Sequence, residues 1–323
     1  MLKPQNYTIK DFKFTSGASL PKLNVEYATF GTKIVDKEGN IINGILYLHG
    51  SSGDYSSVKR IKDILGPGNL IDTDKYFIIC PTALGSPGSS SPSSSNLGHK
   101  FPKYNIEDMV NVQYCFLNEA LNIKLLKGII GTSMGGFLTL QWAVTYPDFM
   151  DFIIPITTSS NVKGQNYAIN NLMNRYIKSD PEYNEGKYEI NPKTGTQNAS
   201  MFLYLFGFSP EYYKGESNEA ILESLDYMKK EGILTDANDI VWRNEASNSY
   251  DLTQSLSKIK AKTLIIGVNQ DQYFPPDIDV IPLAESIEGS KLYLYDSILG
   301  HLGSSEIIKA DGIIKEFLDE IYK

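Results

Sequence analysis

A serine framed by glycines carries the clearest chemical signal in the sequence. Residues 131–136 read Gly-Thr-Ser-Met-Gly-Gly, which places Ser133 in the pattern G-x-S-x-G. In this pattern the serine stands on a sharp turn between a strand and a helix, where its hydroxyl can attack an acyl carbonyl carbon. The glycines let the strand and the helix approach each other without a Cβ clash. A phosphate-binding loop is the main alternative, but no lysine follows the glycines as its G-x-x-x-x-G-K pattern requires.

A serine hydroxyl needs a general base, and the sequence offers three histidines. His301 lies after the last predicted strand and before a C-terminal helix, where the chain order Ser, Asp, His puts the base. His49 ends an early predicted strand, and we expect it to shape the following turn or to be an ordinary buried histidine. His99 lies in a serine-rich loop, and we expect it to be solvated. His301 is therefore the predicted base.

The base needs a carboxylate partner, which should follow a strand between the serine and the histidine. Asp271 follows the apolar run 263–266 and meets this condition. Its carboxylate would accept the proton of the imidazole Nδ1 and stabilise the imidazolium ion. Asp296 is the rival, but it ends a strand only five residues before His301, from where it would struggle to reach the imidazole. We therefore predict that Asp271 is the acid.

Two backbone N–H groups are expected to stabilise the oxyanion that forms on the substrate. One belongs to Met134, the residue after the nucleophile, and the other to the loop after His49, where Ser51 is the best candidate. Losing one such donor typically costs a few kcal/mol of transition-state stabilisation.

The elements that position these residues follow from the apolar pattern. Short apolar runs predict buried parallel strands at residues 45–48, 76–80, 125–130, 152–156 and 263–266. A further strand is predicted at 291–295, and helices are predicted at 107–121, 136–145 and 305–321. This alternation predicts a mostly parallel sheet flanked by helices. Together with the G-x-S-x-G turn and the order Ser, Asp, His, it predicts the α/β-hydrolase fold.

The alternation of strands and helices stops between about residues 159 and 259. This stretch contains helix-like pieces at 170–177, 201–206 and 218–230, and it lies between two predicted core strands. We therefore expect a core formed by residues 1–158 and 260–323. Residues 159–259 are predicted to form a helical lid over the C-terminal edge of the sheet.

Composition excludes several classes of protein. The 323 residues are 41% hydrophobic and 21% charged, which predicts a globular protein with a large core. A net charge of −8, with lysine and glutamate mixed along the chain, argues against nucleic acid or an anionic membrane as partner. The N-terminus does not resemble a signal peptide, and Cys80 and Cys115 stand in apolar contexts typical of buried thiols. These features predict a cytoplasmic location. Scattered histidines and distant cysteines predict neither a metal site nor a cofactor.

With these residues placed, the sequence resembles the homoserine O-acetyltransferase family of α/β hydrolases over most of its length. The segments that carry the resemblance are 77–81, 108–110, 131–136, 141–143, 146–148, 271–276 and 300–301. Segments 146–151, 179–183 and 236–239 resemble the esterase-like branch of that family. By composition, the serine-rich loop at 85–96 would be flexible and solvated. The resemblance implies instead that this loop borders the active site.

The resemblance also bears on substrate binding. The transferases carry an aspartate directly after the base histidine, where it binds the amino group of homoserine, and this chain has Leu302 there. An apolar side chain cannot neutralise an ammonium group. Arg175 falls near the position where the transferases use an arginine for the substrate carboxylate; a solvated arginine on a helix is the alternative. A homodimer through the lid, as in many relatives, is also expected.

Three functions follow from these observations. The first is hydrolysis of a small carboxylic ester through an acyl-enzyme at Ser133. The second is transfer of an acyl group from acyl-CoA to a hydroxyl or amine acceptor, which shares the first half-reaction. The third is a catalytically inactive binding module, which the intact set of serine, histidine and aspartate argues against.

Overall fold

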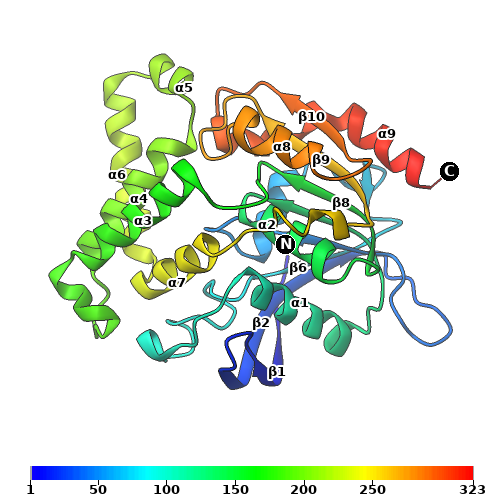
Figure 1. The fold of residues 1–323 in the computed structure, drawn as a ribbon, viewed down its shortest axis with the longest axis horizontal. Helices are drawn as coiled ribbons and strands as arrows, with labels where there is room; N and C mark the ends of the chain where they lie inside the picture. The colour runs from blue at the N-terminus through cyan, green and yellow to red at the C-terminus, as the bar shows by residue number, and fades with distance from the viewer. Residues whose placement is uncertain (1, 323) are drawn as a thin grey trace.

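An eight-stranded sheet organises the computed structural model, which describes residues 2–322 (Figure 1). Its strands are β1 (Gln5–Lys13), β2 (Ser19–Gly31), β3 (Gly44–Leu48), β6 (Phe77–Pro81), β7 (Leu126–Thr132), β8 (Met150–Ile156), β9 (Lys262–Val268) and β10 (Lys291–Tyr295). They lie side by side in the order β1-β2-β6-β3-β7-β8-β9-β10. From β6 to β10 every neighbouring pair is parallel. The predicted fold class, a mostly parallel sheet flanked by helices, is confirmed.

The central strands are buried on both faces because successive side chains point to opposite sides of the sheet. In β3, Leu46 and Leu48 belong to one hydrophobic core, whereas Ile45 and Tyr47 belong to the core on the other face. All five residues of this strand are buried. Such strands read as continuous apolar runs, and for this reason the sequence locates them to within one or two residues.

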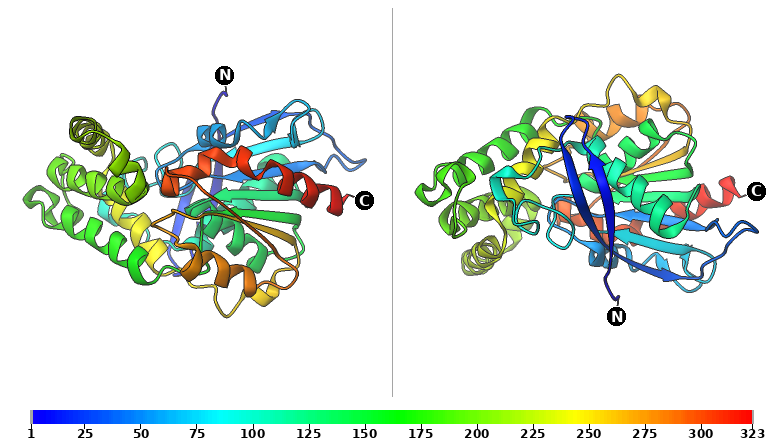
Figure 2. Two further views of the ribbon diagram at one scale, coloured as in Figure 1. Left: turned by 90° about the horizontal axis from the view of Figure 1, so that it is seen from above. Right: turned by 90° about the horizontal axis from the view of Figure 1, so that it is seen from below.

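Strands β1 and β2 were not predicted. They pair with each other in an antiparallel ribbon, and β2 joins the sheet antiparallel to β6 (Figure 2). Along β2, the buried residues Leu23, Val25 and Tyr27 alternate with Asn24 and Glu26. One-sided burial of this kind produces alternation instead of a continuous apolar run. A search for continuous runs therefore misses the ribbon.

Helices cover both faces of the sheet (Figure 2). The core that contains Leu46 is closed by side chains of α1 (Ile106–Leu121), α2 (Met134–Thr145) and α8 (Ile281–Glu285). The other core is closed by η1 (Tyr55–Ile61), η6 (Gly300–Ala310) and α9 (Asp311–Ile321). The shorter elements are β4 (Leu65–Gly66), β5 (Ile71–Asp72), η2 (Gly98–Lys100), η4 (Leu256–Lys258) and η5 (Pro276–Val280).

The C-terminal segment differs from the prediction of one helix over residues 305–321. Tight 3₁₀ turns form η6, and the regular helix α9 begins only at Asp311. The hydroxyl of Tyr295 donates a hydrogen bond of 2.8 Å to the carbonyl oxygen of Gly303. Glu306 also departs from helical dihedral angles. These features interrupt the regular helical pattern before α9.

Residues 157–261, all of them described, contain no strand. They form α3 (Gly164–Lys178), η3 (Pro181–Gly186), α4 (Lys193–Gly207), α5 (Pro210–Gly215), α6 (Asn218–Leu234) and α7 (Ala237–Asn248). Figures 1 and 2 show α3 to α7 gathered at one end of the sheet. The segments that enter and leave this helical region run side by side, since Val162 N–H donates to the Tyr250 carbonyl. The division into a core and an insertion remains a prediction.

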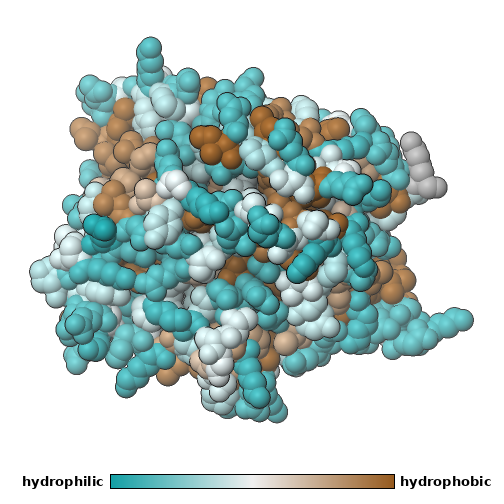
Figure 3. All heavy atoms as spheres, viewed as in Figure 1, coloured by the Kyte–Doolittle hydropathy of each residue, from teal (hydrophilic) through white to brown (hydrophobic). Residues whose placement is uncertain are grey.

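The helical region also exposes apolar side chains. Leu205, Leu222 and Leu234 on α4 and α6 are 51%, 62% and 79% exposed. Figure 3 shows apolar residues gathered at the upper left, over this part of the molecule. Self-association through this surface remains a prediction.

Among the described residues, no helix has the length and apolar character needed to cross a membrane.

Candidate active site

Ser133 occupies the turn between β7 and α2. Its backbone has φ 58° and ψ −121°, a conformation that L-residues rarely adopt and that stores strain at functional sites. The Ser133 N–H donates 2.9 Å to the carbonyl oxygen of Ile156 in the neighbouring strand. A Cβ on Gly131 would lie 2.1 Å from the carbonyl oxygen of Gly135. A Cβ on Gly135 would lie 2.0 Å from the carbonyl oxygen of Leu48. Glycine is therefore required on both sides of the serine.

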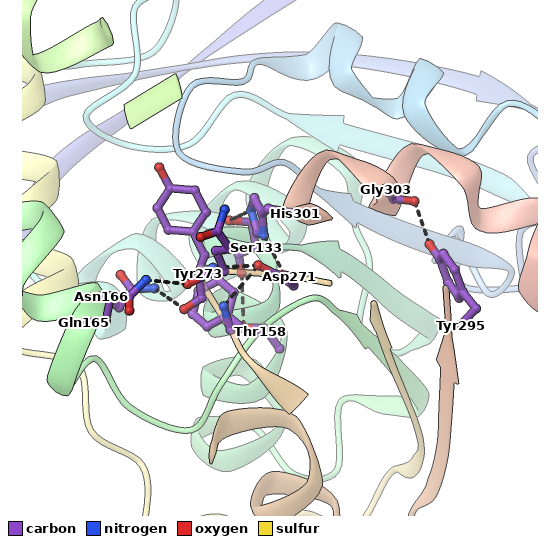
Figure 4. A network of polar contacts seen from close by, with 11 residues as sticks. Ser133, Thr158, Gln165, Asn166, Asp271, Tyr273, Tyr295, His301 and Gly303 are labelled. Atoms are coloured by element: carbon purple, nitrogen blue, oxygen red, sulfur yellow. Dashed lines mark hydrogen bonds and ion pairs between the residues drawn. The ribbon is translucent and has the colours of Figure 1, made fainter. Parts of the chain in front are cut away.

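Three side chains that are far apart in the sequence form one chain of hydrogen bonds (Figure 4). The Oγ atom of Ser133 lies 2.9 Å from Nε2 of His301. Nδ1 of His301 lies 2.8 Å from Oδ2 of Asp271. Since an ionised carboxylate only accepts, the bond to Asp271 places the imidazole proton on Nδ1. Nε2 is then free to accept the proton of the serine hydroxyl.

The carboxylate of Asp271 is fixed by its own backbone surroundings. Its side chain is 1% exposed, and Oδ1 accepts hydrogen bonds from the N–H groups of Tyr273 at 2.7 Å and Phe274 at 3.1 Å. Asp296, the rival carboxylate, instead accepts hydrogen bonds from the side-chain amides of Asn269 and Gln270. The structure therefore brings Asp271, and not Asp296, to His301.

Helices of the 157–261 region contact the loop that carries Asp271. The hydroxyl of Tyr273 donates 2.6 Å to the carbonyl oxygen of Leu203 on α4. Gln272 Nε2 donates to the carbonyl oxygen of Phe208, which follows α4. Asn166 on α3 donates 3.2 Å to the Tyr273 carbonyl (Figure 4). The position of the acid loop thus depends on helices that are remote in the sequence.

His49 fixes the loop that follows β3. Its Nε2 accepts a hydrogen bond of 2.9 Å from the Ala83 N–H, so the proton is on Nδ1, which donates 2.7 Å to the Gly50 carbonyl. Burial lowers the pKa of His49 to about 4, so the ring is neutral at physiological pH. His49 thus shapes the turn, as predicted. Ser51 and Met134 line the same cavity as Ser133.

A cavity of about 700 Å³ lies in front of Ser133 and His301. Most of its wall is apolar or aromatic. The apolar side chains include Phe137, Met173, Leu203, Phe208 and Leu302. Side chains from the sheet edge and from α3, α4, α6 and α7 enclose it together. This volume is suited to a small organic substrate.

The two predicted substrate-binding residues lie in different places. Leu302 lines the cavity next to His301. Arg175 is exposed on α3 and is not part of the cavity wall, so its placement at the substrate is wrong. The buried face of α3 carries Met173 and Ile177 at helical spacing, and Arg175 lies between them on another side of the helix. The alternative, a solvated arginine, is what the structure shows.

Sequence reasoning missed a different arginine. Arg243 on α7 is buried and lines the cavity together with Ser133. A signal was present in the sequence, because Arg243 follows the apolar run Ile240-Val241-Trp242 and shares a helical face with buried residues. A charged residue on the buried face of a helix is uncommon unless it is paired or functional.

Most of the serine-rich loop is buried or half-buried, contrary to the expectation from composition. Ser91 is fully buried, and its Oγ donates to the carboxylate of Asp239 at 3.2 Å. The Ser93 N–H donates to the same carboxylate at 2.9 Å. Burial raises the pKa of Asp239 to about 6. This carboxylate and the backbone N–H groups of Asn24 and Glu26 on β2 bind the loop and order it. Within the described chain, none of residues 85–96 lines the cavity.

The described residues 2–322 offer no candidate metal site. They contain no group of three or more histidine, cysteine, aspartate or glutamate side chains that could hold a metal ion. Cys80 is buried, Cys115 is partly buried, and both are free thiols.

Comparisons with known proteins place this geometry in a family. The alpha/beta hydrolase fold family matches residues 44–298. A probable acyltransferase of Methanothermobacter thermautotrophicus is 47% identical over 312 residues, covering 97% of this chain and 96% of the relative. The homoserine O-acetyltransferase of Corynebacterium glutamicum is 30% identical over 303 residues, covering 83% of this chain and 80% of the relative.

A solved structure supports the same family assignment. An acetylester hydrolase from Corynebacterium glutamicum, 26% identical, superimposes with a TM-score of 0.88 over 98% of this chain and 96% of that chain. The chain therefore belongs to the α/β-hydrolase family, in the group that contains the homoserine O-acetyltransferases and their esterase relatives.

Proposed function

We propose that the protein hydrolyses small carboxylic esters through an acyl-enzyme on Ser133. The observation that carries this proposal is the hydrogen-bonded series from Ser133 through His301 to Asp271, which opens into a cavity of about 700 Å³. A neutral serine is a weak nucleophile, and an adjacent base with an oriented tautomer is what activates it.

The reaction has two halves. In the first, Ser133 Oγ bonds to the ester carbonyl carbon while its proton passes to Nε2 of His301. The imidazolium then gives this proton to the departing alkoxide, which leaves as an alcohol. In the second, a water molecule attacks the acyl carbon and passes a proton to Nε2. The C–Oγ bond breaks, the proton returns to Ser133, and the carboxylic acid is released. Asp271 stabilises the imidazolium in both halves.

The N–H groups of Met134 and Ser51 are proposed to bind the oxyanion of each tetrahedral intermediate. Met134 is the first residue of α2, so its N–H has no partner within the helix. Ser51 is in the loop held by His49 and also lines the cavity. Both donors are preorganised by the backbone, which makes this kind of stabilisation effective.

Water is the proposed acceptor because of Leu302. The residue after the base faces the cavity with an apolar side chain, which offers no counter-charge to the ammonium group of an amino acid. Arg175, the other residue expected to bind such an acceptor, lies outside the cavity. The resemblance to the esterase-like group supports the same proposal.

Acyl transfer from acyl-CoA to another acceptor is the second candidate. It is supported by the relative named as a probable acyltransferase, which is 47% identical and covers nearly the whole chain. Both functions share the acyl-enzyme and differ in the molecule that accepts the acyl group. The cavity is large enough to hold more than a water molecule beside an acetyl group.

One experiment separates the two candidates. The protein is supplied with p-nitrophenyl acetate, or with acetyl-CoA, in the presence and absence of homoserine, and free acetate and O-acetylhomoserine are quantified. Hydrolysis predicts acetate as the main product at every homoserine concentration. Transfer to homoserine with kcat/KM of about 10⁴ M⁻¹s⁻¹ or above would overturn the hydrolase proposal and support the second candidate.

A further inference from the structure

Arg243 is a buried cation in the wall of the substrate cavity. It lies on α7, the residue is 7% exposed, and it lines the same cavity as Ser133 and His301. The other cationic side chain in the wall, Arg60, is exposed, as is the one glutamate there, Glu223. Among the described residues, Arg243 is thus the only permanently charged group buried in this cavity.

Among the described residues, the guanidinium group of Arg243 forms no ion pair or hydrogen bond with a carboxylate, although Asp239, one turn earlier on α7, attracts it electrostatically. Its Nε is buried without a hydrogen-bond partner, and no ion pair joins it to a carboxylate. The acidic residues nearby on α7 bind other groups. Glu245 pairs with Lys103 and Lys178, and Asp239 accepts hydrogen bonds from the serine-rich loop. A buried charge without a directly hydrogen-bonded counter-ion is costly, and a bound anion would offset that cost.

The helix that carries the arginine is held in place by its surroundings. The neighbouring Asn244 side chain donates 2.9 Å to Asn174 on α3, which ties α7 to α3 next to the arginine. Ser247 follows one turn later and also lines the cavity. Burial lowers the pKa of Arg243, while the nearby Tyr104 and Asp239 oppose this shift, and a guanidinium group remains charged at neutral pH. The site therefore presents a fixed positive charge beside an apolar wall, where electrostatic attraction is stronger than in water.

We propose that Arg243 binds a carboxylate group of the substrate, so that the preferred esters carry a free carboxylate in addition to the ester carbonyl. A guanidinium group matches the geometry of a carboxylate through two parallel N–H donors. Arg243 lies on α7, whereas Arg175, the residue that the sequence analysis expected to bind a substrate carboxylate, lies on α3. The inference rests on the proposed function for its substrate, but the binding site itself does not require turnover.

The carboxylate could belong to the acyl half or to the alcohol half of the ester, and two substrate pairs distinguish these sources. Monomethyl glutarate carries the carboxylate on the acyl half, and methyl pentanoate is its uncharged counterpart. Acetoxyacetate carries the carboxylate on the alcohol half, and propyl acetate is its uncharged counterpart. Acid release is followed by pH-stat titration for the unmodified protein, Arg243→Met and Arg243→Lys. Arg175→Met is the matched control, because it removes an exposed arginine from a neighbouring helix.

The unmodified protein is expected to favour one carboxylate ester over its uncharged counterpart by roughly 10- to 100-fold in kcat/KM, as a charge-assisted hydrogen bond predicts. Arg243→Met is expected to remove this preference by raising KM for the carboxylate ester towards that of its uncharged counterpart. Arg243→Lys should restore part of the preference, and Arg175→Met should keep all of it. Equal kcat/KM for both members of both pairs, or a preference that survives Arg243→Met, would overturn the proposal.

Binding is measured separately so that a failure of the proposed hydrolysis can be recognised. Titration calorimetry of monomethyl glutarate and of acetoxyacetate into Ser133→Ala needs no catalysis. Binding of either anion that is lost in the Ser133→Ala, Arg243→Met double variant would support the carboxylate site even if neither ester were turned over. Binding of this kind without turnover of either ester would overturn the proposed hydrolysis but not the carboxylate site. Anion binding that is equal in the two variants would contradict the carboxylate site.

Discussion

The hydroxyl of Tyr273 donates a hydrogen bond of 2.6 Å to the carbonyl oxygen of Leu203. This bond joins the loop of the proposed acid to helix α4, seventy residues earlier in the chain. The ring of Tyr273 also contacts His301 edge-on, with centroids 4.9 Å apart. One side chain therefore connects the acid loop, the proposed base and the helices above the cavity.

Tyr273→Phe tests this connection. The substitution keeps the ring against His301 but leaves the Leu203 carbonyl without its donor, so the free energy of unfolding should fall by about 1 kcal/mol. We also expect a lower kcat, since the acid loop loses a contact that fixes its position. Urea unfolding and ester turnover measure the two effects. Tyr167→Phe, which alters an exposed tyrosine of α3, is the control. Equal effects of the two substitutions would mean that the bond has no special role.

Asp271→Asn tests the choice of carboxylate. An amide at this position favours the wrong imidazole tautomer, and turnover should fall by roughly 10⁴-fold by analogy with a serine protease. Asp296→Asn should change turnover by roughly twofold at most, as an ordinary surface substitution does. Steady-state kinetics of both variants, compared by kcat, show which carboxylate is the acid. A larger loss in Asp296→Asn would show that the acid has been misassigned.

His49 predicts a specific dependence of stability on pH. In the unfolded chain its pKa is near 6.5, whereas burial lowers it to about 4 in the folded protein. Between these values the unfolded state binds the proton more tightly, so stability falls as the pH drops from 6.5 to 4. The loss attributable to this residue is up to about 3 kcal/mol.

The measurement compares the unmodified protein with His49→Gln by urea unfolding across this range. Asp239 acts in the opposite direction, because its pKa is raised to about 6, but it is present in both proteins and cancels in the comparison. The stability difference, unmodified minus variant, should rise between pH 4 and 6.5 and stay constant above pH 6.5. A difference that does not change with pH would contradict the neutral, buried state of His49.

Leu302→Asp tests the proposed preference for water as the acceptor. A fully buried leucine is worth roughly 1.5–3 kcal/mol, and Leu302 is half-buried, so kcat/KM for small neutral esters should fall by roughly three- to tenfold. The new carboxylate would also provide a partner for an ammonium group. O-acetylhomoserine formation from acetyl-CoA should therefore rise relative to acetate formation. Leu302→Asn, of similar size but uncharged, is the control. The same product ratio in both variants would argue against a role for charge at this position.

Much of the core could be predicted from the sequence because its strands are buried on both faces. Runs such as 45–48 and 152–156 are continuously apolar, and a short run of this kind is typical of a strand buried on both faces of a sheet. The turn at Ser133 was equally readable, since glycine at 131 and 135 is required by the close approach of strand and helix. By contrast, the ribbon of β1 and β2 has one polar face and was missed.

The cavity could be predicted only in part. Leu302 lines the cavity because it directly follows His301 in the chain, and its role in substrate binding remains a prediction. Arg175 was misplaced and Arg243 was missed, because the packing of α3 and α7 against the sheet decides which side of each helix faces the cavity. Similarly, the serine-rich loop has the composition of a flexible linker, yet hydrogen bonds to β2 and to the buried carboxylate of Asp239 order it. Contacts between segments so far apart in the sequence leave no local pattern.

The most direct test of the account is to find which residue carries the acyl group during turnover. The protein is mixed with p-nitrophenyl acetate, quenched in acid within the first turnovers, digested, and mapped by mass spectrometry. We predict one acetyl group on the peptide that contains Ser133, no such adduct in Ser133→Ala, and a loss of turnover in that variant by several orders of magnitude. An acetyl group on another residue, or undiminished turnover in Ser133→Ala, would contradict the proposed mechanism.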